Sequence, residues 1–206
     1  CHLARDAALA RGQYSILLTA EFTALRLAVL SGKTPDAALE RLRQTLKENR
    51  QFLLLRSLDL CRAWLDAQRG RVCADEWFMA PEADASFLNP VLPMVRTVQN
   101  EVLLASGAYT KLLARRDACE ALNEGLHTNL ASLYLHIQLA CAENRLGRTD
   151  AARRELETAC SIAVPDGLYL PFAEHAAYLG ALLPEIFAGN AAAEAVLRCT
   201  AKPNSS

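Results

Sequence analysis

The stretch that decides the fold reads Leu146-Gly147-Arg148-Thr149-Asp150-Ala151-Ala152. Glycine readily adopts the left-handed conformation that ends a helix, so Gly147 is expected to close the preceding apolar segment. Thr149 is expected to be the N-cap of the next helix. Asp150 would fall in the first turn, where the helix dipole favours an acid. These residues together predict the tight turn of a helical hairpin.

The same signal occurs early in the chain, in residues 32–38, where Pro35 is expected at a first helical position. Two further glycines follow apolar helical runs, and the four are separated by 38, 37 and 40 residues. Such spacing is typical of stacked helical repeats. We therefore expect one repeat domain over residues 1–190, followed by a capping helix and a polar tail over 191–206. Its hairpins are expected to turn near Gly32, Gly70, Gly107 and Gly147, ahead of a closing helix.

Apolar periodicity predicts two kinds of helix. The segment 126–146 carries apolar stripes on opposite sides, and a helix of this kind packs against neighbours on both sides. Its partner, 149–163, carries a single stripe and a charged outer face. No stretch alternates with the period of two that a strand needs. The expected fold is all-α, a right-handed superhelical array of antiparallel helix hairpins. The remaining expected helices are 2–11, 13–30, 35–49, 52–68, 72–80, 91–106, 109–123, 171–187 and 191–199, with a connection over 80–90.

Composition excludes several classes of function. The net charge is -1, whereas a nucleic-acid-binding domain usually carries a basic excess, so this chain is not expected to bind DNA or RNA itself. The seven cysteines are scattered singly, which is typical of reduced core side chains in a cytoplasmic protein. No apolar run reaches the roughly 20 residues that span a bilayer. Because the chain starts at Cys1 and ends in a polar tail, we expect a piece of a longer protein.

No pattern of residues indicates catalysis, a cofactor or a metal site. His127, His136 and His175 have no acid or nucleophile at helical spacing, so we interpret them as hydrogen-bonded packing residues, with a base or groove residue as the alternative. The nucleophile motif G-x-S-x-G is absent, and metal ligands are not clustered. The cluster 77–79, Trp-Phe-Met, is expected to plug the core of a degenerate repeat rather than to form an exposed contact patch.

Residues 133–166 fit the 34-residue tetratricopeptide pattern, with small residues at Ala140, Ala152 and Ala159 and the turn at Gly147. The segments 101–114 and 159–184, the latter with Pro165-Asp166-Gly167, resemble the sensor region of MalT-type, LuxR-family bacterial transcriptional regulators. That resemblance implies a helix-turn-helix domain beyond this chain and, in some members, an ATPase module upstream. The phosphate-binding motif G-x-x-x-x-G-K-[ST] is absent here, so ATP binding by this chain is not expected.

The tetratricopeptide register places five side chains on the concave surface of the array. They are Thr97, Glu101, Tyr134, Asn144 and Arg145. We expect this surface to bind a small-molecule effector or a protein or peptide partner, without catalysis. The expected function is signal sensing in a LuxR-family regulator that acts through its absent DNA-binding domain. The alternatives are a tetratricopeptide-like adaptor that holds a peptide or protein, and a structural oligomerisation module.

Overall fold

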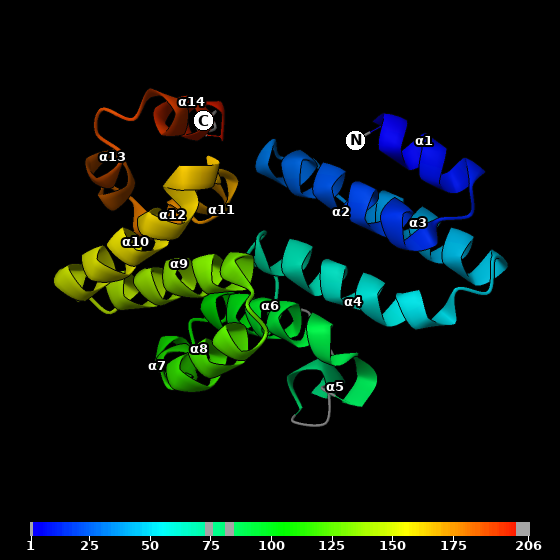
Figure 1. The fold of residues 1–206 in the computed structure, drawn as a ribbon, viewed down its shortest axis with the longest axis horizontal. Coiled ribbons are helices and arrows are strands. Elements are labelled where there is room, and N and C mark those ends of the chain that lie inside the picture. The colour runs from blue at the N-terminus through cyan, green and yellow to red at the C-terminus, as the bar shows by residue number, and fades with distance from the viewer. Residues whose placement is uncertain (1, 73–75, 81–84, 201–206) are drawn as a thin grey trace. The chain divides into compact units, whose positions relative to one another are not determined.

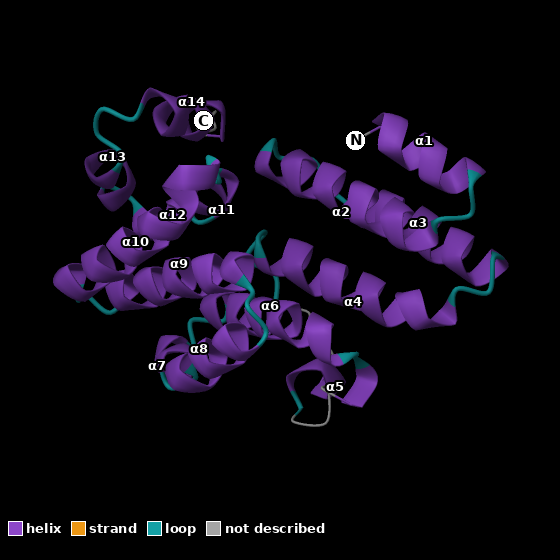
Figure 2. Cartoon of the chain, viewed as in Figure 1, coloured by secondary structure: helices purple, strands orange, loops and turns teal. Residues whose placement is uncertain are grey.

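A computed structural model describes residues 2–72, 76–80 and 85–200 of the chain (Figure 1). Within these residues every regular element is a helix and no strand occurs, which confirms the all-α prediction (Figure 2). The chain forms two compact units, Cys1–Ala74 and Asp75–Ser206. The single repeat domain expected over residues 1–190 stays a prediction. In the part of the chain that the structure describes, no helix is long and apolar enough to cross a membrane.

The first unit contains helices α1 (His2–Ala10), α2 (Tyr14–Leu30), α3 (Asp36–Glu48) and α4 (Phe52–Ala67). Helix α1 packs on α2, and both α2 and α3 pack on α4. As its single apolar stripe predicts, α3 buries Leu39, Leu42 and Leu46. Pro35 is the N-cap of α3 rather than its first residue, so the expected position was off by one.

The second unit is built around the two-sided helix α9. Its elements are α5 (Glu76–Met79), the 3-10 turn η2 (Asn89–Val91), α6 (Leu92–Ala105), α7 (Tyr109–Leu113), α8 (Arg116–Gly125), α9 (Asn129–Arg145), α10 (Thr149–Ala163), η3 (Val164–Asp166), α11 (Leu170–Glu174), α12 (Ala176–Leu179), α13 (Leu182–Ile186) and α14 (Ala191–Thr200). Helix α9 contacts α6, α7 and α8 as well as α10, α11 and α12. Most of both predicted stripes is buried, namely Leu133, Ile137, Ala140, Leu135, Leu139 and Ala142.

The hairpin of α9 and α10 turns at Gly147, as predicted. Gly147 has a φ of 76°, in the left-handed region. The next amide, that of Arg148, donates to the carbonyl of Glu143 over 2.9 Å, which satisfies an end group of α9. Helix α10 begins at Thr149 itself, and Arg148 occupies the N-cap without a side-chain hydrogen bond. The capping role predicted for Thr149 is therefore wrong by one residue.

Two of the expected helices are divided in the structure. The helix expected over 109–123 is divided into α7 and α8. Helix α8 runs to Gly125, and the left-handed residue before α9 is His127, with a φ of 52°. The single helix expected over 171–187 is three short helices. The chain is interrupted at His175, between α11 and α12, and turns at Gly180, where φ is 53° and ψ is -125°.

The core role expected for the cluster 77–79 is confirmed for the residues whose side chains the structure describes. Phe78 is buried, and Met79 packs against the core of the second unit. The side chain of Gln99 donates to the carbonyl of Phe78 over 2.8 Å, which fastens α5 to α6. The side chain of Trp77 lies outside the described residues.

Candidate functional site

The sequence-predicted side chains of α9 contact one segment, residues 170–179, which contains α11 and α12 and is called the closing segment below. The amide of Asn144 donates to the carbonyl of Tyr178 over 2.8 Å. The guanidinium of Arg145 donates to the carbonyl of Ala177 over 2.9 Å and lies 5.1 Å from the centre of the Tyr178 ring. These contacts fasten the closing segment to the carboxyl end of α9.

A buried polar cluster lies where α6 and α9 meet the closing segment. Glu101 of α6 accepts hydrogen bonds at Oε2 from Nε2 of His175 over 2.9 Å and from Nε2 of Gln138 over 2.8 Å. The other ring nitrogen of His175, Nδ1, lies 2.7 Å from the carbonyl oxygen of Pro171. Because a carbonyl oxygen only accepts, Nδ1 carries a hydrogen, and the carboxylate is the acceptor for Nε2. With Glu101 as a carboxylate, these contacts correspond to an imidazolium–carboxylate pair.

The pKa of His175 is consistent with that assignment. Burial by itself lowers the pKa of His175, but the charge of Glu101 and its hydrogen bond raise it by more. The carbonyl of Pro171 and the charge of Glu174 act in the same direction, so the pKa lies above the ordinary value. The pair thereby joins α6 to the junction of α11 and α12.

Burial and the charge of Glu101 also change the pKa values of two neighbouring side chains, Cys141 and Tyr178. Burial, and then the charge of Glu101, raise the pKa of the Cys141 thiol well above its usual value. The same two causes raise the pKa of the Tyr178 hydroxyl to about 12. The hydroxyl of Tyr134 donates to Oε2 of Glu174 over 2.9 Å. The Cys141 thiol and the Tyr178 hydroxyl therefore stay neutral at physiological pH.

The structure corrects the predicted surface position of three side chains. Thr97, Glu101 and Tyr134 were expected on an open concave face, and they are only 5%, 0% and 3% exposed. The closing segment covers Glu101 and Tyr134, while Thr97 donates through its hydroxyl to the carbonyl of Pro93 within α6. Asn144 is half-buried and Arg145 is exposed. A binding role for any of the five stays a prediction.

Two of the predicted residues line a small pocket between the amino-terminal ends of α6 and α9. Its volume is about 150 Å³. It is called the α6–α9 pocket below, and its lining residues are Pro90, Pro93, Met94, Thr97, Thr128, Leu130, Ala131 and Tyr134. Because Tyr134 also binds Glu174, one side chain connects this pocket with the closing segment.

The sequence did not reveal the acidic partners of His136 and His175. His136 Nδ1 lies 2.9 Å from Oε2 of Glu155, whose other oxygen accepts from Nη2 of Arg116 over 2.5 Å. Burial raises the pKa of Glu155, but His136 and Arg116 lower it by more, so its net pKa is below the ordinary value. This cluster joins α8, α9 and α10. Residue spacing within one helix cannot indicate such partners, because each acid lies on a different helix.

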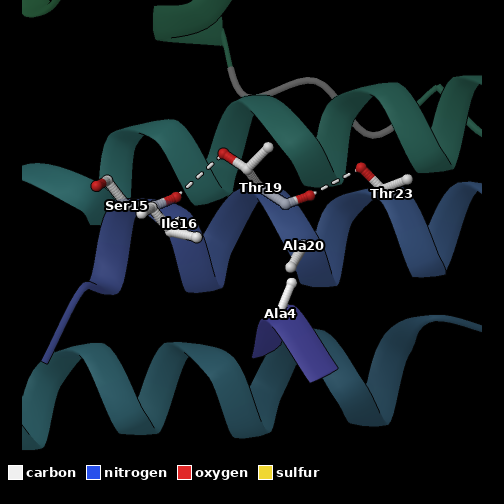
Figure 3. A pocket seen from close by; sticks show the side chains of 6 residues that line it. All are labelled: Ala4, Ser15, Ile16, Thr19, Ala20 and Thr23. Atoms are coloured by element: carbon white, nitrogen blue, oxygen red, sulfur yellow. Dashed lines mark hydrogen bonds between the residues drawn. The ribbon is translucent and has the colours of Figure 1, made fainter. Parts of the chain in front are cut away.

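A second concave surface lies in the first unit, between α1 and α2 (Figure 3). Its volume is about 450 Å³, and its lining residues are Ala4, Ser15, Ile16, Thr19, Ala20 and Thr23. The hydroxyls of Thr19 and Thr23 donate to backbone carbonyls four residues earlier in α2, which reduces the polarity of this surface.

Among the described residues no three His, Cys, Asp or Glu side chains form a group that could hold a metal ion. In comparisons with known proteins, no family model, no curated protein and no solved structure matches the chain.

Proposed function

We propose that this chain is the non-catalytic sensing domain of a MalT-type, LuxR-family transcriptional regulator of the bacterial cytoplasm. Its helices would form a right-handed, tetratricopeptide-like superhelix, and DNA would be bound only by a helix-turn-helix domain outside this chain. The proposal is supported by the residue pattern of 159–184 and by the glycine-turned hairpins. An effector or partner would shift the balance between two positions of the closing segment.

One observation supports this mechanism most directly. The closing segment is attached to α6 and α9 by polar side-chain contacts, through Glu101–His175, Asn144–Tyr178 and Arg145–Ala177. A ligand with carbonyl groups competes for Asn144 and Arg145, because these side chains donate only to backbone carbonyls of the closing segment in the contacts described. Differential binding of this kind is the physical basis of a ligand-driven switch, typically with a coupling of about 1–3 kcal/mol.

The proposal is tested by a thermal-stability screen of the chain against a panel of small metabolites, because a ligand that binds only the folded state raises the melting temperature. A metabolite that stabilises the wild type is then measured on the double variant Asn144→Ala/Arg145→Ala and on the control Arg154→Ala, whose side chain is exposed on α10. We expect the response to vanish in the double variant and to persist in the control. An absence of stabilisation by any metabolite, or equal responses, contradicts the proposal.

The second candidate function is an adaptor that holds a peptide or protein. It is favoured by the surface between α1 and α2, whose lining residue Ile16 is 48% exposed. The two functions differ in the parent gene: a reading frame that continues into a short basic helix-turn-helix domain supports the regulator, and a frame that stops supports the adaptor.

A further inference from the structure

We infer that the outer face of α2 is an interface with a second copy of this chain, in which the two α2 helices cross antiparallel about a two-fold axis. Four residues of this face carry the contact and are called the outer stripe below, namely Ile16, Ala20, Thr23 and Leu27. The inference goes beyond the proposed sensing function and does not rest on it.

The outer stripe lies on the side of α2 that faces solvent. Its residues follow one another at spacings of four, three and four, which places them along one face of the helix. Ile16 and Leu27 are each 48% exposed. The buried residues of α2 lie on the opposite side and are Leu17, Leu18, Leu25 and Val29. Because the outer face of a surface helix normally carries charged side chains, an apolar outer stripe is the kind of surface that another helix covers.

The partner of the outer stripe must be uncharged. The two charged residues of α2 are engaged elsewhere, since Glu21 pairs with Arg5 over 3.7 Å and the guanidinium of Arg26 lies 5.6 Å from the centre of the Phe22 ring. The hydroxyl of Thr23 donates to a backbone carbonyl four residues earlier over 2.9 Å, so it keeps its hydrogen bond when water is excluded. A charged partner would lose hydration here without gaining an opposite charge. A second copy of α2 presents a surface with the required chemistry.

The order of side-chain sizes makes the outer stripe complementary to itself. Along α2 the order is large, small, small, large, which reads the same in both directions. In an antiparallel crossing centred between Ala20 and Thr23, Ala20 meets the partner copy's Thr23, and Ile16 meets the partner copy's Leu27. The small side chains let the helix axes approach at the crossing, and the large ones, about 8 Å along the axis on either side, fill the space where the helices diverge. Such self-complementarity is what a two-fold interface requires.

The neighbouring helix α1 leaves room for the crossing. Ala4 is the residue of α1 that lines the hollow beside the outer stripe, and Figure 3 shows its methyl group next to Ala20. The hollow has a volume of about 450 Å³. Side chains of a second α2 can therefore enter it without displacing α1.

The expected dimer is reversible. One crossing of two helices is smaller than the roughly 1,200 Å² of a standard stable interface, so we expect a dissociation constant of about 1–100 µM.

Sedimentation velocity of the whole chain measures the dimer, and two single variants locate its interface. Ala20→Lys and Thr23→Glu each place a charge at the crossing with no opposite charge to balance it, so each should weaken dimerisation at least about tenfold. Both new residues are good helix formers, so α2 is retained, which circular dichroism verifies. The matched control is Ala121→Lys, at an exposed position of α8, and it should dimerise like the wild type.

An equimolar mixture of the two variants tests the contact itself. The ammonium introduced at position 20 of one copy then faces the carboxylate introduced at position 23 of the other, so the dimer should return. Its return also shows that the single variants are folded. If either variant does not fold, Ile16→Lys and Leu27→Glu replace the pair, because these exposed positions meet in the same crossing.

Four results overturn the inference. They are a wild type that stays monomeric up to about 500 µM, well above the expected dissociation constant, single variants that dimerise like the wild type, a control that loses the dimer, and a mixture that stays monomeric. A peptide that binds a monomeric chain at the outer stripe likewise contradicts the second copy and favours the adaptor.

Discussion

Nε2 of His175 lies 2.9 Å from Oε2 of Glu101, and both residues are buried. The two residues are 74 positions apart, and they connect α6 with the junction of α11 and α12. A buried pair of this kind gives little net stability over an apolar replacement, but the loss of one partner leaves an unpaired charge in the interior. The position of the closing segment therefore depends on both residues together.

The substitution Glu101→Gln is expected to destabilise the chain by about 3–5 kcal/mol, since His175 loses the carboxylate that balances its charge. The measurement is equilibrium unfolding in urea. The control is Glu120→Gln in α8, where a 36% exposed side chain pairs with Arg116 and the expected loss is below about 1 kcal/mol. Equal losses of unfolding free energy in the two variants would contradict a charged pair between Glu101 and His175.

Stability is expected to depend on pH through His175. Its pKa in the folded state is raised above the ordinary value of 6.5, because the contributions of Glu101 exceed the opposing effect of burial. The stability that it contributes is fully present below the unfolded pKa and is lost as the pH rises through the folded pKa. Urea midpoints should therefore fall as the pH increases from about 6.5, the ordinary pKa of histidine.

The variant His175→Gln isolates this effect. It should be less stable than the wild type at pH 6 and should lack the part of the pH dependence that His175 causes. The lowered pKa of Asp36, caused first by its hydrogen bond from Arg71, has the opposite sign and acts in the acid range. A wild-type stability that rises between pH 6.5 and 9, or an unchanged slope in the variant, argues against an ionised His175.

The turn at Gly147 gives a prediction with an internal control. Alanine at this position is strained by the φ of 76°, and we expect Gly147→Ala to cost about 1 kcal/mol. Gly125→Ala is the matched change, because Gly125 is the last residue of α8, has no positive φ, and a Cβ there meets no atom within 4 Å. It should be neutral or stabilising by up to about 1 kcal/mol. Thermal unfolding of both variants distinguishes the two effects, and a similar change in both would contradict the role of the left-handed turn.

The local part of the fold was predictable from the sequence. The turn at Gly147 depends on a conformation that one residue type favours, and the two stripes of 126–146 depend on helical periodicity alone. The interruption at Gly180 was missed, because the apolar spacing of 171–187 is compatible with one helix and the glycine acts through its backbone conformation.

The candidate site was predictable only in part. The repeat register selected Glu101, Tyr134 and Asn144, which contact one segment in the structure. No periodic pattern indicates that this segment, with His175, covers them. Contacts between residues 34 to 74 positions apart are determined by tertiary packing, so sequence reasoning expected an open surface where the structure has a buried cluster.

The thiols of Cys61 and Cys160 are expected to react slowly in the folded chain. Burial raises the pKa of Cys61 to about 12 and that of Cys160 to about 11. At pH 8 the thiolate fraction is then roughly one in ten thousand for Cys61 and one in a thousand for Cys160, and only the thiolate is nucleophilic. Peptide mapping after brief iodoacetamide treatment should find both unlabelled, and labelled in urea. Rapid labelling of either thiol in the native chain would contradict its raised pKa.

The closing segment is attached to α6 through Glu101 and His175. The most direct test is hydrogen exchange of residues 170–179 in the wild type and in Glu101→Gln, under conditions where both are folded. We predict that exchange in this segment accelerates at least about tenfold in the variant, since an increase of that size corresponds to 1.4 kcal/mol of lost protection, while residues 36–48 of the first unit are unaffected. Unchanged exchange in residues 170–179 would contradict the account.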